Sequence, residues 1–305
     1  MMSPTARRVI PRRLVALVVA LGMCGACGVQ SGGLDHAATR VPTPPGSGKD
    51  WRIVFAEEFD GTDYDHGKLT PCFDWNYGDC TSSFNEGRET YRPEQVRVDA
   101  GAAALVAEPL YPPKPDYACF QGACTYRSGL LSTARPNALD GRYLFPFTYG
   151  YVESRMKLPG QSGFFTAFWM LPTDPTYRYR SEIDIVEVLG GDPDTVYMTY
   201  AYDDRRRSYE VNRGGSGNGD CAVRDHSRDW VRFGVDWQPD HIAWYIDGVK
   251  CGEFTDASQI EDGPMQLIAN VMVDNEWERE AGSVLAAPTL VDQLEIDYIR
   301  VYQQQ

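Results

Sequence analysis

Short runs of apolar residues separated by turn-forming residues fill the chain from residue 51 to residue 305. The runs are rich in β-branched and aromatic residues and are bounded by Gly, Pro, Asp and Asn, a pattern that predicts β-strands. Helical periodicity is almost absent. We expect strands at 51–55, 95–98, 103–107, 149–157, 164–171, 183–188, 196–202, 230–237, 241–246, 265–272 and 295–302. So many short strands predict one all-β domain built as a two-sheet sandwich.

Two local patterns add detail to this prediction. Charged residues alternate with apolar or small ones over residues 152–158, so one face of that strand is expected to contact water or line a cleft. Residues 242–249 predict a β-hairpin, because Asp247-Gly248 is a two-residue turn that tolerates positive backbone angles.

Three carboxylates stand close together in residues 181–188. Side chains alternate along a strand, so Glu182 and Asp184 share one face. Strict alternation would turn Glu187 to the opposite, apolar face, where burial of its charge costs several kcal/mol. One extra residue near Ile185 and Val186, a β-bulge, returns Glu187 to the acidic face and sends the apolar residues inward. We therefore expect a bulge in this strand.

Carboxylates in this arrangement suit a retaining glycosidase. That reaction needs one ionised carboxylate as nucleophile and one protonated acid, about 5–5.5 Å apart. We assign Glu182 as nucleophile and Glu187 as general acid/base. Asp184 between them is expected to hydrogen-bond the nucleophile and, by its charge, to keep the acid protonated. The alternatives are a solvated acidic strand or a set of calcium ligands.

The run from Glu182 to Glu187 resembles the bulged signature of glycoside hydrolase family 16, which is typical of its laminarinase-like members. Further segments resemble the family in the same order along the chain: residues 55–59, 75–77, 126–129, 149–153, 167–171, 244–248 and 296–302. The resemblance implies an antiparallel β-jelly-roll sandwich with a substrate cleft on its concave face. It also implies the roles given above to Glu182, Asp184 and Glu187.

The chain departs from the family pattern at three places that border the expected cleft. Tyr177 and Tyr179 stand where members active on β-1,3-glucan usually carry a tryptophan before the nucleophile. Residues 274–276 replace the usual glycine pair before Trp277, and residues 196–203 lack a histidine that is common after the catalytic strand. These changes leave the reaction type intact and leave the sugar and the linkage open.

Aromatic rings in a sugar cleft lie against the apolar face of a pyranose. Trp169, Tyr177 and Trp277 are the candidates for this role, and each is alternatively a core or rim residue. Asn85 and Arg88 belong to a loop that resembles one bordering the donor subsites.

Glu58 and Asp297 resemble the pair that holds a structural calcium ion in some family members. Two carboxylates are a weak calcium signal, because the ion takes six to eight oxygen ligands. The calcium therefore stays open, and catalysis requires no cofactor.

The first residues predict export. Four arginines precede the apolar run 14–23, which is too short to span a bilayer. Small residues beside Cys27 resemble a lipoprotein cleavage site with Cys27 lipidated, and an ordinary signal peptide with another cleavage site is the alternative. We expect a signal peptide at 1–27, a flexible tether at 28–50 and a catalytic domain at 51–305. The protein would then lie in the cell envelope or outside the cell, with a lipid anchor as its membrane contact.

Charge narrows the choice of partners. The leader holds four of the 29 basic residues and no acidic ones, so 25 basic and 43 acidic residues remain and the mature net charge is about −18. Such a surface repels nucleic acid and anionic lipid but tolerates a neutral polysaccharide. A basic patch at residues 205–207 could act locally, although such a triplet is more often a solvated turn. We expect a monomer.

The mature chain contains six cysteines, an even number that favours disulfides in an exported protein. Proximity along the sequence suggests three pairs: Cys72 with Cys80, Cys119 with Cys124, and Cys221 with Cys251.

Two classes of function follow from these patterns. The first is an endo-acting hydrolase of β-linked polysaccharide, either a β-1,3-glucan-like or a related β-glucan or galactan chain, or a transglycosylase that uses the same intermediate. The second is a carbohydrate-binding envelope protein without turnover. The retention of all three acids favours the enzyme.

Overall fold

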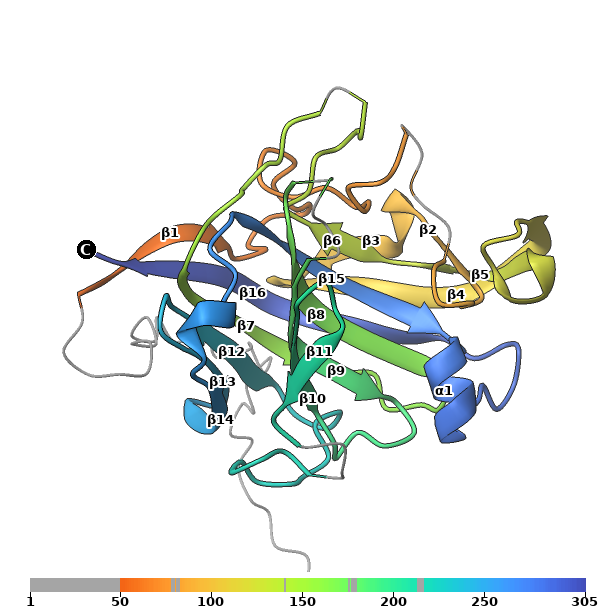
Figure 1. Ribbon diagram of the computed structural model, residues 1–305. Helices are drawn as coiled ribbons and strands as arrows, with labels where there is room; N and C mark the ends of the chain where they lie inside the picture. Colours follow the sequence, from red (N-terminus) through yellow and green to blue (C-terminus); the bar gives the residue numbers. More distant parts are fainter. Residues whose placement is uncertain are drawn as a thin grey trace, which may run out of the picture. The chain divides into compact units, whose positions relative to one another are not determined.

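Two β-sheets form the fold of the computed structural model (Figure 1). The structure describes residues 50–77, 80, 83–139, 141–174, 176, 180–212 and 217–305. The predicted export signal, Cys27 and the tether up to Lys49 lie outside these residues. Within the described part, no helix is long and apolar enough to cross a membrane.

The larger sheet has ten strands, and its pairs are antiparallel except for β2 with β5. In spatial order the strands are β14 (Val249–Phe254), β13 (Ile242–Ile246), β12 (Val231–Trp237), β7 (Gly150–Lys157), β16 (Asp292–Gln304), β4 (Ala102–Pro115), β5 (Ala123–Ser128) and β2 (Glu89–Tyr91). Two further strands, β1 (Trp51–Glu57) and β3 (Val96–Asp99), pair with β16 and β4.

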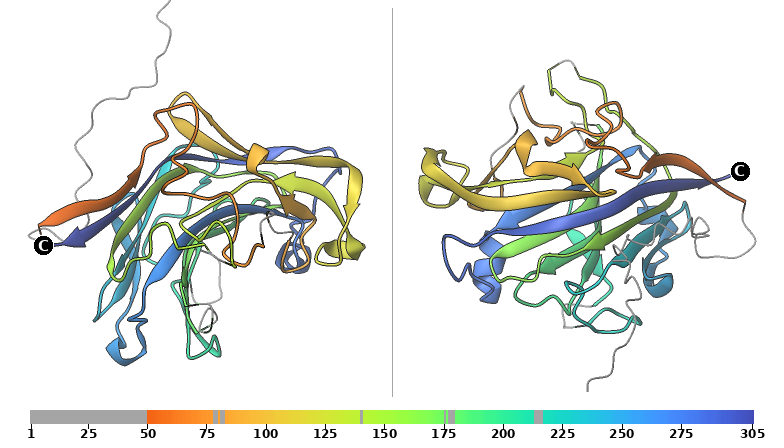
Figure 2. Two further views of the ribbon diagram at one scale, coloured as in Figure 1. Left: turned by 90° about the horizontal axis from the view of Figure 1, so that it is seen from above. Right: turned by 180° about the vertical axis from the view of Figure 1, so that it is seen from behind.

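The smaller sheet has six antiparallel strands: β11 (Arg207–Glu210), β10 (Tyr197–Tyr202), β9 (Glu182–Leu189), β8 (Phe164–Pro172), β15 (Met265–Val273) and β6 (Leu130–Ser132). Helices are few and short: α1 (Glu276–Ala281) and the 3-10 turns η1 (Pro93–Gln95), η2 (Phe120–Gly122) and η3 (Ala257–Gln259). Figure 2 shows the sheets as two curved layers. The sequence-based prediction of an all-β, two-sheet jelly-roll sandwich is confirmed.

The main core lies between the two sheets, because both turn an apolar face inward. Phe168 and Ile183 of the smaller sheet are fully buried together with Val152, Val235 and Trp244 of the larger one. Burial of a side chain of this size stabilises the fold by roughly 1.5–3 kcal/mol.

The predicted bulge in β9 is confirmed. Asp184 pairs with Thr199 of β10 and Glu187 with Tyr197, so one more residue separates the partners on β9 than on β10. The pairing of β9 with β8 shifts at the same place. Ile185 and Val186 both enter the main core as a result, and Glu187 returns to the face that carries Glu182 and Asp184.

The β13–β14 hairpin also matches its prediction, with positive φ at both Asp247 and Gly248. Strand β4, by contrast, continues to Pro115, well beyond the predicted end at residue 107. Prolines lack the amide hydrogen of a regular ladder and interrupt the strand pattern. The pairing of β4 with β5 shifts between Pro109 and Lys114, which accommodates them.

Three disulfides join the six cysteines in the pairs suggested by proximity: Cys72–Cys80, Cys119–Cys124 and Cys221–Cys251. The first lies in the connection between β1 and β2, the second closes the tip of the β4–β5 hairpin, and the third ties β14 to the segment after β11.

Candidate active site

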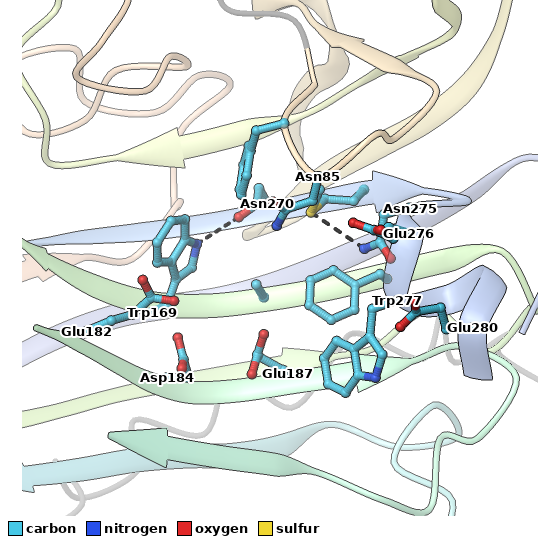
Figure 3. Close-up of a pocket in the computed structure, with 14 residues that line it drawn as sticks. Asn85, Trp169, Glu182, Asp184, Glu187, Asn270, Asn275, Glu276, Trp277 and Glu280 are labelled. Atoms are coloured by element: carbon cyan, nitrogen blue, oxygen red, sulfur yellow. Dashed lines mark hydrogen bonds between the residues drawn. The ribbon is translucent and has the colours of Figure 1, made fainter. Parts of the chain in front are cut away.

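A cavity of about 410 Å³ opens on the face of the smaller sheet that points away from the main core (Figure 3). Residues of β8, β9 and β15 form its floor. Phe84 and Asn85, which precede β2, and helix α1 form its walls. The volume lies within the range of small-ligand sites.

The three carboxyl groups of β9 line this cavity. Figure 3 shows Glu182, Asp184 and Glu187 in a row, with Trp169 near Glu182 and Trp277 near Glu187. The glutamates are partly exposed, whereas Asp184 is buried. The bulge brings all three acids to one face, and it thereby gives the two glutamates access to a common ligand.

Burial and the charges of neighbouring groups determine which of the three carboxyl groups hold a proton. Burial raises the pKa of Glu187 to about 8, and the charges of Glu182 and Glu210 add to this effect. Burial raises the pKa of Asp184 well above its usual range, and the neighbouring charges of Glu182 and Glu187 raise it further. Both groups therefore favour the neutral form at pH 7. This differs from the sequence-based expectation that Asp184 acts through its charge; a neutral Asp184 can act as a hydrogen-bond donor.

Glu182 differs from its neighbours because it contacts a cation. Its carboxylate forms an ion pair with Arg205, which lies in the turn between β10 and β11. Burial raises the pKa of Glu182, but the charge of Arg205 and a hydrogen bond with Asp184 oppose that shift. Of the three acids, Glu182 is therefore the one best placed to carry the negative charge.

Aromatic side chains surround the acids. Trp169 is 5% exposed, packs against Phe84 and donates from Nε1 to Oδ1 of Asn270 at 2.8 Å. It therefore forms the floor of the cavity. Trp277 is partly buried, and its ring meets Tyr197 edge-on at a centroid distance of 4.7 Å. A short helix, in place of the usual glycine pair, carries Trp277 to the cavity: Asn275 caps α1 through a hydrogen bond from the amide of Glu278.

The structure brings together most of the residues proposed for substrate binding. Asn85, Trp169 and Trp277 line the cavity. Arg88 does not, because its guanidinium binds the carboxylate of Asp274 and stacks on a phenylalanine ring. Tyr177 lies outside the described residues.

The carboxylates proposed as calcium ligands already have cationic partners. Arg300 binds both carboxylate oxygens of Glu58, each at 2.7 Å. Arg155 donates to Asp297 at 2.8 Å. Among the described residues, no group of three or more His, Cys, Asp or Glu side chains could hold a metal ion. A calcium site at Glu58 and Asp297 is therefore not confirmed, and each carboxylate is paired with an arginine.

Several cavity residues were missed by the sequence analysis: Phe84, Phe165, Ala167, Asn270, Met272, Asn275, Glu276 and Glu280. Asn270 left a usable signal, since it is an amide within the otherwise apolar run 267–273. A buried amide of this kind needs hydrogen-bond partners, and Asn270 finds them in Trp169 and Tyr91. Phe165, Ala167 and Met272 lie in strands that are apolar on both faces, so alternation does not orient them. The remaining residues lie in loops or on the short helix α1, which the strand pattern does not predict.

The family model for glycosyl hydrolases family 16 matches residues 141–300, more than half of the chain, and this range includes all three acids of β9. The chain belongs to glycosyl hydrolases family 16. This membership makes the protein a glycoside hydrolase and agrees with the jelly-roll fold and the bulged strand.

Relatives of this family 16 chain have been described in sequence and in structure. It is 27% identical to a β-glucanase of Rhodothermus marinus over 272 residues, which cover 83% of this chain and 85% of the relative. The chain spans only about a third of the next two curated relatives that it matches.

Two solved structures show the same fold. The catalytic domain of an endo-1,3-beta-glucanase (laminarinase) from Thermotoga petrophila superposes with a TM-score of 0.64 at 25% identity, covering 85% of this chain and 100% of the other. SCLam, described as a non-specific endo-beta-1,3(4)-glucanase from family GH16, gives 0.67 at 26% identity, covering 87% and 94%.

Proposed function

We propose that the protein is a retaining endo-glycosidase that cleaves internal β-glycosidic bonds of a β-glucan. One observation carries this proposal: the bulge in β9 turns Glu182 and Glu187 into one cavity, where the first contacts a cation and the second favours the neutral form. An ionised and a protonated carboxyl group that face one cavity are what double displacement requires.

In the first step, a carboxylate oxygen of Glu182 attacks the anomeric carbon, and the bond to the leaving sugar oxygen breaks. Glu187 gives its proton to that oxygen. In the second step, the Glu187 carboxylate takes a proton from water as the water oxygen attacks the anomeric carbon, and Glu182 leaves as a carboxylate. Two inversions give net retention. Asp184, when neutral, donates a hydrogen bond to Glu182 in the resting state and stabilises its charge.

A neutral glucan is supported by the names of the relatives, which include a β-glucanase, a glucan endo-1,3-beta-glucosidase and a non-specific endo-beta-1,3(4)-glucanase. The acidic cavity agrees with this choice, since Glu276 and Glu280 also line it and would repel an anionic sugar. The aromatic rings of Trp169 and Trp277 offer apolar contact to pyranose rings.

The test is reducing-sugar release from a panel of β-1,3-, β-1,4- and mixed-linkage glucans, galactans and mannans. We expect activity on at least one β-glucan, a β-configured product in the first minutes of NMR observation, and no activity for Glu182→Gln. Glu276→Gln serves as a control for loss of one cavity carboxylate. Binding without release on every polysaccharide would support a non-catalytic binding protein, and products longer than the substrate would support transglycosylation.

We further propose that the enzyme is exported by the signal at residues 1–27, lipidated at Cys27, tethered by residues 28–50 and monomeric. The arginine-flanked apolar run, the small residues beside Cys27 and three disulfides support export. Incorporation of labelled palmitate into the wild type and its loss in Cys27→Ala would test the anchor. Labelling that persists in Cys27→Ala would contradict this assignment.

A further inference from the structure

The turn between β10 and β11 has a backbone conformation that non-glycine residues rarely adopt. Asp203, Asp204 and Arg205 have φ values of 56°, 55° and 59°, so three successive non-glycine residues occupy the left-handed region. Each costs roughly 1–2 kcal/mol. The turn is anchored beside the catalytic strand, because the amide of Asp204 donates to the carbonyl of Arg180 at 3.1 Å. This geometry places Arg205 against Glu182.

The surroundings of Glu182 are otherwise acidic. Asp184 and Glu187 flank it on β9, and Glu210 acts on Glu187 from β11. Glu276 and Glu280 of α1 line the same cavity. No lysine or arginine is among the described residues that line that cavity. Arg205 lies beside the cavity, in the turn between β10 and β11, and places a positive charge next to Glu182.

Accordingly, we infer that Arg205 is a positioning residue for the nucleophile: it holds Glu182 as an oriented, ionised carboxylate and assists the departure of that carboxylate in the second chemical step. The inference rests on the proposed function. In the first step the negative charge of Glu182 is consumed as the bond to the anomeric carbon forms. In the second step that bond breaks and its electron pair returns to the carboxylate, where a neighbouring cation stabilises the developing charge.

A role for Arg205 in binding an anionic sugar is less consistent with the structure. Arg205 is already engaged by Glu182, and its side chain is 31% exposed. Glu276 and Glu280, which line the same cavity, would repel the same ligand. The contact therefore points to the nucleophile and away from a subsite for charged substrates.

The two steps can be separated with a 2-deoxy-2-fluoro-β-glucosyl or oligoglucosyl fluoride. Fluoride leaves without protonation, so the rate of inactivation reports attack by Glu182, and the rate of reactivation reports its departure. Arg205→Gln and Arg205→Lys are compared with the wild type. Arg206→Gln is the matched control, because Arg206 lies next in the chain, is 72% exposed and pairs with the exposed Asp204.

We expect reactivation of Arg205→Gln to be about tenfold slower than in the wild type, and the acidic limb of its inactivation profile to move up by about one pH unit. The reactivation rate of Arg205→Lys should lie between those of the wild type and Arg205→Gln, and Arg206→Gln should reactivate at the rate of the wild type. Unchanged reactivation and an unchanged limb in a folded Arg205→Gln would overturn the inference, as would equal changes in Arg206→Gln.

If Arg205→Gln does not fold, the wild type itself provides the measurement. The ion pair is partly exposed, so 1 M salt should weaken it and move the acidic limb upward relative to 0.05 M salt. A limb that does not move would count against the inference. Failure of the proposed function is distinguishable, because the wild type would then form no covalent adduct on Glu182 in the mass spectrum.

Discussion

The indole nitrogen of Trp244 donates a hydrogen bond to the main-chain carbonyl of Asp184 at 2.8 Å. The donor belongs to β13 of the larger sheet and the acceptor to the bulge of β9 in the smaller one. Trp244 is fully buried. The bond therefore crosses the core and fixes the backbone at the residue between Glu182 and Glu187, the two glutamates that we propose as catalytic.

We expect Trp244→Phe to lower the free energy of unfolding by about 1–3 kcal/mol, since a buried carbonyl loses its partner. It should also lower kcat, because the bulge relaxes. Trp237→Phe is a control of the same type: Trp237 is equally buried and donates from Nε1 at 3.0 Å to the carbonyl of Glu261, a residue that is not part of β9. Denaturant unfolding and kcat are measured for both. Equal losses of kcat would show that the Trp244 bond has no special relation to the site.

Glu187 should set the alkaline limit of activity. Its pKa of about 8 means that the acid loses its proton above this pH, so kcat/KM should fall there for polysaccharide. Glu187→Gln should remove that limb and reduce polysaccharide hydrolysis by about 10²–10⁴-fold. Formation of the glycosyl-enzyme from an activated aryl glycoside should be much less affected, because its leaving group needs no proton. Similar losses of this first step on both substrates would contradict the acid role.

The buried acid Glu278 should make stability depend on pH. Burial raises its pKa to about 9 in the folded state, compared with about 4.5 when unfolded. The folded state therefore prefers the proton, and stability is full below pH 4.5 and is lost as the pH rises toward 9. Glu278→Gln retains an oxygen that can accept the hydrogen bond from the amide of Asn275. Because glutamine does not ionise, the variant should not show this pH-dependent loss of stability.

The Tm of Glu278→Gln should consequently rise relative to the wild type between pH 5 and pH 9, as measured by thermal melts. Glu276→Gln, an exposed change on the same helix, should follow the wild type. A constant difference between Glu278→Gln and the wild type at all pH values would contradict a buried neutral acid.

Chelation should leave the fold unaffected. Glu58 and Asp297 are neutralised by Arg300 and Arg155, so we expect the same Tm in EDTA and in millimolar calcium. A Tm that falls in EDTA and recovers with calcium would show that these carboxylates bind the ion after all.

Much of the fold could be predicted from the alternation of polar and apolar residues, because a β-strand with one buried face carries this pattern in its own sequence. The bulge could be predicted for the same reason: Glu187 stands at a position that strict alternation would bury. The division into ten and six strands could not, since it depends on pairings between distant segments, such as β16 with β1, β4 and β7. The extension of β4 was hidden by its prolines.

The site was predictable to a similar degree. The three acids share one strand, so their grouping is a local property. Arg205 lies in a turn whose contact with Glu182 depends on how β10 and β11 fold back, and the sequence offered only a basic triplet. For Arg88 the error is the reverse. The sequence suggested a residue at the substrate cleft, but its guanidinium forms an ion pair with Asp274 and does not line the cavity. Long-range ion pairs of this kind leave no periodic signal.

The assignment of Glu182 as nucleophile can be tested most directly by chemical rescue. In Glu182→Ala, azide can enter the space left by the carboxylate and attack an activated β-glycoside from the same side. We predict restored turnover with an α-configured glycosyl azide, identified by NMR. A β-configured azide, or rescue that occurs in Asp184→Ala and not in Glu182→Ala, would contradict the account.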